Sequence, residues 1–126
     1  MNWTTLLCDD RIRSYKKSSS TDLRTEFEKD YHRIIGSASF RRLQDKTQVF
    51  PLDRSDFVRT RLTHSLEVSS LAKSLGQNIS ESIRVNVKDD TFLPEHKAAV
   101  CDILQCAGLI HDIGNPPFGH FGETSI

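Results

Sequence analysis

The residues that could do chemistry gather near the end of the chain, between His111 and Glu123. Within these thirteen positions lie two histidines, an aspartate and a glutamate, arranged around a Gly-Asn-Pro-Pro break. His111 and Asp112 are adjacent, and an imidazole next to a carboxylate can bind a divalent transition metal. His120 and Glu123 are three apart, and a histidine paired with a carboxylate is suited to proton transfer near neutral pH. The segment therefore predicts half of a metal-centred hydrolytic site, and the other half must come from upstream.

Two predicted helices would position the metal ligands. A helix turns by about 100° per residue, so His64 shares one face of a helix over residues 61–84 with apolar residues at its own spacing. These residues are Val68, Leu71 and Leu75. A second helix over residues 95–111 puts His111 in line with Val100, Leu104 and Ala107. We expect the two helices to pack on these faces and to bring the histidines together. Either histidine alone is more often a hydrogen-bonded core residue than a metal ligand. Together with Asp112 they offer ligands for Mn²⁺, Fe²⁺ or Zn²⁺, among which this set of donors does not choose.

The remaining elements are predicted to be helical as well, so the fold class is all-α. Residues 21–24 can cap a helix whose apolar stripe continues into a second piece beyond Gly36. The stripe and its continuation comprise Phe27, Tyr31, Ile34, Ile35, Phe40 and Leu43. Residues 47–60 lose the helical pattern, and a proline at position 51 leaves one short β-hairpin as a candidate there. Gly114 can supply a left-handed residue after the second long helix. Residues 1–21 are predicted to be a flexible lead-in.

Composition limits the classes of protein. A hydrophobic fraction of 37% and a charged fraction of 27% over 126 residues are typical of one globular domain or part of one. No apolar run is long enough for a membrane span, and the first residues lack a secretory signal, so we expect a cytoplasmic protein without membrane contacts. Three cysteines without a Cys-x-x-Cys spacing indicate free thiols. The net charge is zero, but residues 41–61 carry six basic and three acidic side chains. This stretch suits an anionic ligand, although a solvated charged surface explains it equally well.

Several stretches resemble the HD superfamily of metal-dependent phosphohydrolases, and within it the deoxyguanosinetriphosphate triphosphohydrolase family. They are Phe-Glu-Lys-Asp-Tyr at 27–31, Phe-Arg-Arg-Leu-Gln-Asp-Lys-Thr-Gln-Val-Phe-Pro-Leu at 40–52, Arg-Thr-Arg-Leu-Thr-His-Ser-Leu-Glu-Val at 59–68, and the His-Asp doublet with the residues up to 123. The resemblance covers about residues 24–124. It implies an HD-domain helical bundle and hydrolysis of a deoxynucleoside triphosphate, dGTP or another, to the deoxynucleoside and tripolyphosphate.

The resemblance also implies a role for each matching residue. The metal ligands would be His64, His111 and Asp112. His120 would act at the α-phosphate and the leaving 5′ oxygen, and Glu123 would orient this histidine or the attacking water. Gln48 would contact the sugar, and Arg61 would reach the phosphates. We expect Mn²⁺ or Mg²⁺ in such a site, with Fe²⁺ or Zn²⁺ as alternatives.

Members of that family are several times longer than 126 residues. The resemblance therefore implies that residues 22–126 are the N-terminal part of an HD domain, in an incomplete bundle. The fourth metal ligand would be a downstream aspartate, and the full-length protein would be a homo-oligomer. Two other functions remain open. One is an HD-type phosphodiesterase or nucleotidase acting on monophosphates or cyclic nucleotides. The other is a non-catalytic module that binds nucleotide or single-stranded DNA through its basic stretch.

Overall fold

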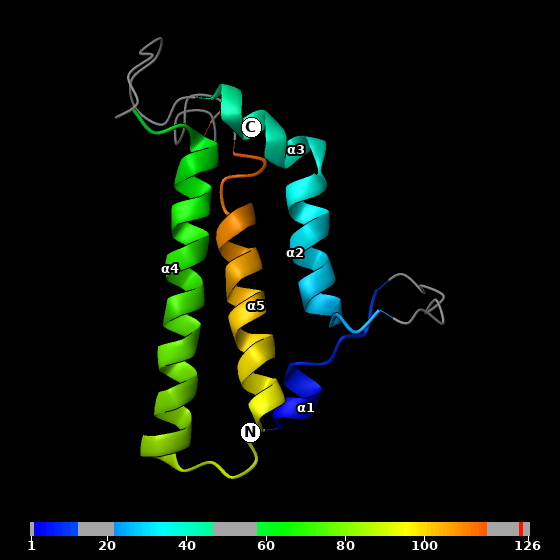
Figure 1. Cartoon of the computed structure of the whole chain (residues 1–126), viewed down its shortest axis with the longest axis vertical. Coiled ribbons are helices and arrows are strands. Elements are labelled where there is room, and N and C mark those ends of the chain that lie inside the picture. Colours follow the sequence, from blue (N-terminus) through cyan, green and yellow to red (C-terminus); the bar gives the residue numbers. More distant parts are fainter. Residues whose placement is uncertain (1, 13–21, 47–57, 116–123, 125–126) are drawn as a thin grey trace.

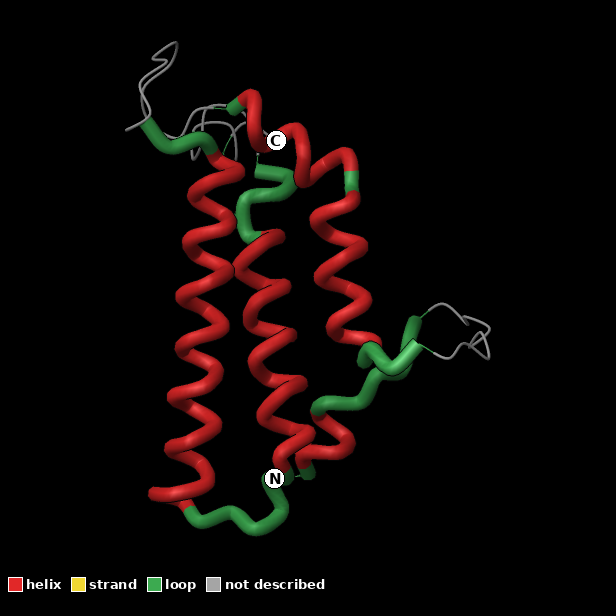
Figure 2. Tube along the Cα trace, viewed as in Figure 1, coloured by secondary structure: helices red, strands yellow, loops and turns green. Residues whose placement is uncertain are grey.

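The computed structural model describes residues 2–12, 22–46, 58–115 and 124. Its helices are α1 (Trp3–Leu6), α2 (Glu26–Gly36), α3 (Ala38–Arg41), α4 (Arg61–Ser82) and α5 (Pro94–Ile110). A 3₁₀ turn, η1 (Arg42–Asp45), follows α3, and a π-helical turn, η2 (Ile83–Val87), follows α4. No strand occurs within these described ranges, so the prediction of an all-α fold is confirmed there (Figure 2).

The long helices α4 and α5 lie side by side and antiparallel, and α2 lies on the opposite side of α5 from α4 (Figure 1). The piece formed by α3 and η1 crosses the end of the bundle where α4 begins and α5 ends. Phe40, Leu43 and Leu109 form the buried core at this end. Partly buried apolar side chains surround this core: Tyr31, Ile34, Ile35, Leu62 and Ile113. The bundle is therefore packed most tightly around the end that carries the predicted metal ligands.

Small residues form the contact between α4 and α5. The buried positions of α4 are Ser65, Ser69, Gly76 and Ser80. On α5, a Cβ atom added to Gly108 would lie only 2.6 Å from the Cα of Ser69. The two backbones thus approach more closely than leucine side chains would allow.

The prediction that α4 packs through its leucine stripe is wrong. Leu71 and Leu75 are 71% and 55% exposed, and Ala107 on α5 is also exposed. These residues flank the contact instead of filling it. The physical reason is that small residues of α4, such as Ser65, Ser69 and Gly76, lie about 100° around the helix from this leucine stripe. Their small side chains allow α4 and α5 to approach each other on that face.

The start of α2 also differs from the prediction. Thr25, not residues 21–24, caps the helix through a capping box: its hydroxyl accepts from Glu28 N at 3.1 Å, and its own N–H donates to Glu28 Oε2 at 2.7 Å. Asp22 instead pairs with Arg24 at 2.8 Å. The left-handed conformation predicted for Gly114 is confirmed, with φ of +90°.

Two predicted segments lie partly outside the described residues. Of the lead-in, residues 2–12 are described, and the indole of Trp3 donates to Asp89 Oδ2 at 2.9 Å while its ring meets Phe92 edge-on. The domain boundary at residue 21 stays a prediction. The candidate hairpin falls mostly on residues 47–57, which are not described, but the N–H of Arg61 donates to the carbonyl of Lys46 at 2.9 Å and joins the two flanks. Nowhere in the described part of the chain is a helix both long and apolar enough to cross a membrane.

The buried Leu109 and the exposed leucine stripe of α4 are expected to contribute very differently to stability. Leu109→Ala is expected to lower the free energy of unfolding by about 2–5 kcal/mol, because Leu109 is fully buried and its loss leaves a cavity. Leu75→Ala, the matched control on α4, is expected to change it by less than about 1 kcal/mol. Urea unfolding of both variants measures the difference. Equal losses would show that the stripe is buried after all.

Candidate metal centre

His64 lies in the first turn of α4, where the helix start is fixed by its cap. Thr60 is the N-cap, and its hydroxyl accepts from Thr63 N at 3.2 Å. The N–H of His64 donates to the carbonyl of Thr60 at 3.0 Å. His64 is half-buried and directly precedes Ser65, which is fully buried against α5. The cap and the packing of Ser65 therefore hold the imidazole at the edge of the contact between α4 and α5.

His111 and Asp112 lie just after α5, at the same end of the bundle. The helix gives way to a turn in which Ile113 N donates to the carbonyl of Ile110 at 2.9 Å. His111 Nδ1 lies 2.7 Å from the carbonyl oxygen of Gly108. A carbonyl only accepts, so Nδ1 carries the proton and Nε2 keeps its lone pair for a ligand. This backbone contact selects the tautomer that a metal site needs.

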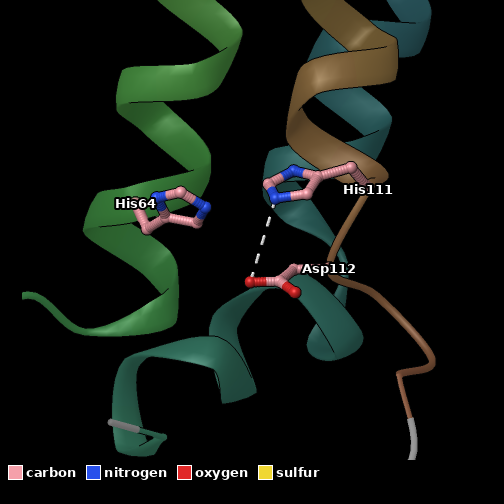
Figure 3. Close-up of side chains that lie close together, drawn as sticks. All are labelled: His64, His111 and Asp112. Carbon is pink, nitrogen blue, oxygen red and sulfur yellow. Dashed lines mark ion pairs between the residues drawn. The ribbon is translucent and has the colours of Figure 1, made fainter. Parts of the chain in front are cut away.

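The three predicted ligands converge, as Figure 3 shows. The rings of His64 and His111 have their centroids 5.2 Å apart and meet nearly perpendicularly, at 71°. Nε2 of His111 lies 3.9 Å from Oδ2 of Asp112. One ligand atom from each residue lies within 4.8 Å of the others. Three ligands spread evenly around one cation, each with a bond of roughly 2.1 Å, are about 3.6 Å apart. Side-chain movements of less than about 1 Å would therefore suffice for all three to share a cation.

Asp112 carries the clearest sign of a missing partner. It is only 7% exposed, and its Oδ1 accepts from Asn115 Nδ2 at 2.8 Å. Its Oδ2 is buried and has no hydrogen-bond partner in the described structure. Leaving a buried carboxylate oxygen unsatisfied costs about 1–3 kcal/mol. A cation between this oxygen and the two imidazoles would remove that cost. The donor set, two nitrogens and an oxygen, thus fits a divalent metal.

The other predicted site residues have different outcomes. Arg61 is the first residue of α4, three positions and nearly one turn before His64, so the two face the same way. Among the described residues it has no ion-pair partner. Gln48, His120 and Glu123 lie outside the described residues, and their roles stay predictions. Sequence reasoning gave no role to Gly108 or Asn115. The signal for both was their spacing of three residues from His111 and Asp112.

The family model described as HD domain matches residues 61–125, which include α4, α5 and all three converging ligands. The chain belongs to the HD-domain family. HD domains are metal-dependent, and the matched residues include the cluster of His64, His111 and Asp112.

Curated relatives of this HD domain carry more specific names. A deoxyguanosinetriphosphate triphosphohydrolase-like protein of Listeria monocytogenes is 58% identical over 128 residues, covering 100% of this chain and 28% of the relative. A protein of the same description from Synechocystis is 48% identical over 126 residues, with the same coverage. A deoxyguanosinetriphosphate triphosphohydrolase of Enterobacter is 47% identical over 118 residues, covering 92% of this chain and 23% of the relative. The chain therefore spans about a quarter of the length of these relatives.

Proposed function

We propose that this chain is the metal-binding, N-terminal portion of a hydrolase that cleaves deoxynucleoside triphosphates into the deoxynucleoside and tripolyphosphate. The observation that carries the proposal is the convergence of His64, His111 and Asp112, with one carboxylate oxygen buried and unsatisfied between them. The choice of substrate is supported by the names of relatives up to 58% identical, described as deoxyguanosinetriphosphate triphosphohydrolases or proteins like them. A phosphodiesterase or nucleotidase has no comparable support.

The three ligands would hold a divalent cation, for which two imidazoles favour Mn²⁺ or Fe²⁺ over Mg²⁺, a cation that prefers oxygen ligands. When bound, such a cation supplies a Lewis acid for a phosphoryl oxygen and offsets part of the charge of the phosphates. A fourth ligand from a downstream segment would complete the set, in accord with relatives more than three times as long as this chain.

The start of α4 provides the anion-binding side of the proposed site. The helix dipole favours negative charge at this end, and Arg61 stands in the first turn of α4. His64 lies one turn further along the same helix. A triphosphate lying across this helix end would meet a cationic side chain, a positive dipole end and the metal ligands within one turn. The two partners of the proposal, a metal and a polyphosphate, thus share one end of the bundle.

His120 is proposed to transfer the proton of the reaction. Water attacks the α-phosphorus, the bond from phosphorus to the 5′ oxygen breaks, and this oxygen leaves with a proton from His120. The proton lost by the attacking water returns His120 to its protonated form. Glu123 would orient His120 or the attacking water, and Gln48 would contact the sugar. The products are the deoxynucleoside and tripolyphosphate, so atoms and charge balance without a further reactant.

The test adds dGTP and Mn²⁺ to the purified protein and separates the products by ion-exchange chromatography. Tripolyphosphate and deoxyguanosine are expected in equal amounts, with no product from dGMP. His120→Ala is expected to lower the rate about 100-fold or more while leaving Mn²⁺ binding intact, because general acid catalysis is lost and the ligands remain. Release of pyrophosphate or orthophosphate, or hydrolysis of dGMP, would contradict the proposal.

A further inference from the structure

Asn115 makes a side-chain hydrogen bond that was not predicted from the sequence. Its side-chain Nδ2 donates to Oδ1 of Asp112 at 2.8 Å. The carboxylate accepts only, so the amide must face it with its nitrogen. Asp112 is 7% exposed, and a hydrogen bond to a carboxylate gains strength when water is excluded. The contact is therefore made by an exposed amide directly to a buried carboxylate, which is a candidate metal ligand.

The backbone after α5 is shaped to bring this amide back to Asp112. Ile113 donates to the carbonyl of Ile110 and packs its side chain against the buried core, which anchors the turn. Gly114 then adopts a φ of +90°, a conformation that residues with a Cβ rarely take. The reversal at Gly114 returns Asn115 to the side of Asp112, three residues earlier in the chain. The position of Asn115 is thus fixed by packing on one side and by glycine on the other.

The bond decides which oxygen of Asp112 is available. With Oδ1 held by Asn115, the carboxylate cannot rotate freely, and Oδ2 remains 3.9 Å from His111 Nε2. Gly108 acts on His111 in the same way, because its carbonyl oxygen accepts a hydrogen bond from Nδ1–H, with the two heavy atoms 2.7 Å apart. Each of the two neighbouring ligands is therefore held by a polar group on the side that faces away from the centre. Such outer contacts orient ligands and raise metal affinity.

We infer that Asn115 is a positioning residue that fixes the Asp112 carboxylate as a metal ligand. The inference rests on the metal centre of the proposed function and deepens it. It assigns Asn115 an effect on metal affinity that is exerted through Asp112.

The test compares Mn²⁺ affinity, measured by electron paramagnetic resonance, between the unchanged protein and Asn115→Ala. The variant is expected to bind Mn²⁺ roughly 10–100-fold more weakly. Asn86→Ala is the matched control. Asn86 Nδ2 also donates to a side chain, Ser82 Oγ at 2.9 Å, but Asn86 is exposed and lies in η2, at the opposite end of α4 from His64. Asn86→Ala should leave the affinity within about twofold. Thermal unfolding in EDTA should show that both variants still fold, with a lower midpoint for Asn115→Ala, which leaves Asp112 Oδ1 without its donor.

A double-mutant cycle separates positioning from general loop stabilisation. In an Asp112→Ala background, Asn115→Ala is expected to cause no further loss of Mn²⁺ affinity, because the residue it positions is absent. Two results would overturn the inference without contradicting the metal centre. One is that Asn115→Ala binds Mn²⁺ as tightly as the unchanged protein. The other is that the losses of Mn²⁺ affinity caused by the two substitutions add up in the double variant. Failure of the unchanged protein to bind Mn²⁺ would instead overturn the proposed centre itself, and the role of Asn115 with it.

Discussion

Asp112→Asn is expected to have two effects. It should make the metal-free protein more stable, and it should abolish tight metal binding. Oδ2 of Asp112 is buried without a hydrogen-bond partner in the described structure. In the variant, Oδ1 still accepts from Asn115, while the new amide group faces His111 Nε2, whose lone pair is free because Nδ1 donates to Gly108. Closing the gap to His111 Nε2 from 3.9 Å to hydrogen-bond distance would replace an unsatisfied acceptor with a satisfied donor, which should raise the free energy of unfolding by about 1–3 kcal/mol.

Urea unfolding in EDTA and in excess Mn²⁺ measures both effects. The unchanged protein should gain stability from Mn²⁺, since a ligand that binds only the folded state shifts the equilibrium. Asp112→Asn should gain almost none, because a neutral amide is a poor ligand for a divalent cation. His64→Gln is the control: it should also lose the Mn²⁺ effect, but without added stability in EDTA, since it relieves no unsatisfied group. A metal-free Asp112→Asn protein less stable than the unchanged one would show that Oδ2 is not a strained ligand.

The sequence predicted the helices and the convergence of the metal ligands, although it predicted the wrong packing face. Apolar periodicity locates a helix and its stripe, but it contains no information about how closely two backbones can approach. Ser69 and Gly108 look unremarkable in the sequence, yet they make the close contact between α4 and α5. The histidines still meet because each lies near this contact: His64 lies just over one turn before Ser69, and His111 lies one turn after Gly108.

The polar contacts around the ligands could not be predicted with the same rules. The bond from Asn115 to Asp112 depends on the positive φ of Gly114 and on the anchoring of Ile113, both of which are tertiary features. The cap of α2 was missed for a different reason. Two threonines four residues apart, Thr21 and Thr25, are candidate N-caps in the sequence. Only Thr25 is followed three positions later by a glutamate, Glu28, which completes a capping box. That signal was present in the sequence.

Gly108→Ala is expected to be the most damaging small substitution in the bundle. Its Cβ would lie 2.6 Å from Ser69 Cα and 2.9 Å from Ser69 N, both backbone atoms that cannot rotate away. Carbon atoms normally rest about 3.5–4.0 Å apart, so α4 and α5 must separate by roughly 1 Å. Overpacking of this kind costs about 1–3 kcal/mol or more, against which the better helix propensity of alanine returns at most about 1 kcal/mol.

The same separation should reach the metal centre, because Gly108 lies one turn before His111 and opposite the turn that follows His64. Ligands must stay within about 0.5 Å of their working positions, so Mn²⁺ affinity should fall roughly tenfold or more. Gly76→Ala is the matched control in the same interface. A Cβ at Gly76 would lie 3.1 Å from Leu104 Cδ1 and 3.2 Å from the Cα of Cys101, a milder overlap than at Gly108, and Gly76 lies three turns from His64. Gly36→Ala, with no atom within 4 Å, controls for the change of residue alone. If Gly108→Ala lowers stability but leaves Mn²⁺ affinity equal to that of Gly76→Ala, the spacing of the helices does not set the spacing of the ligands.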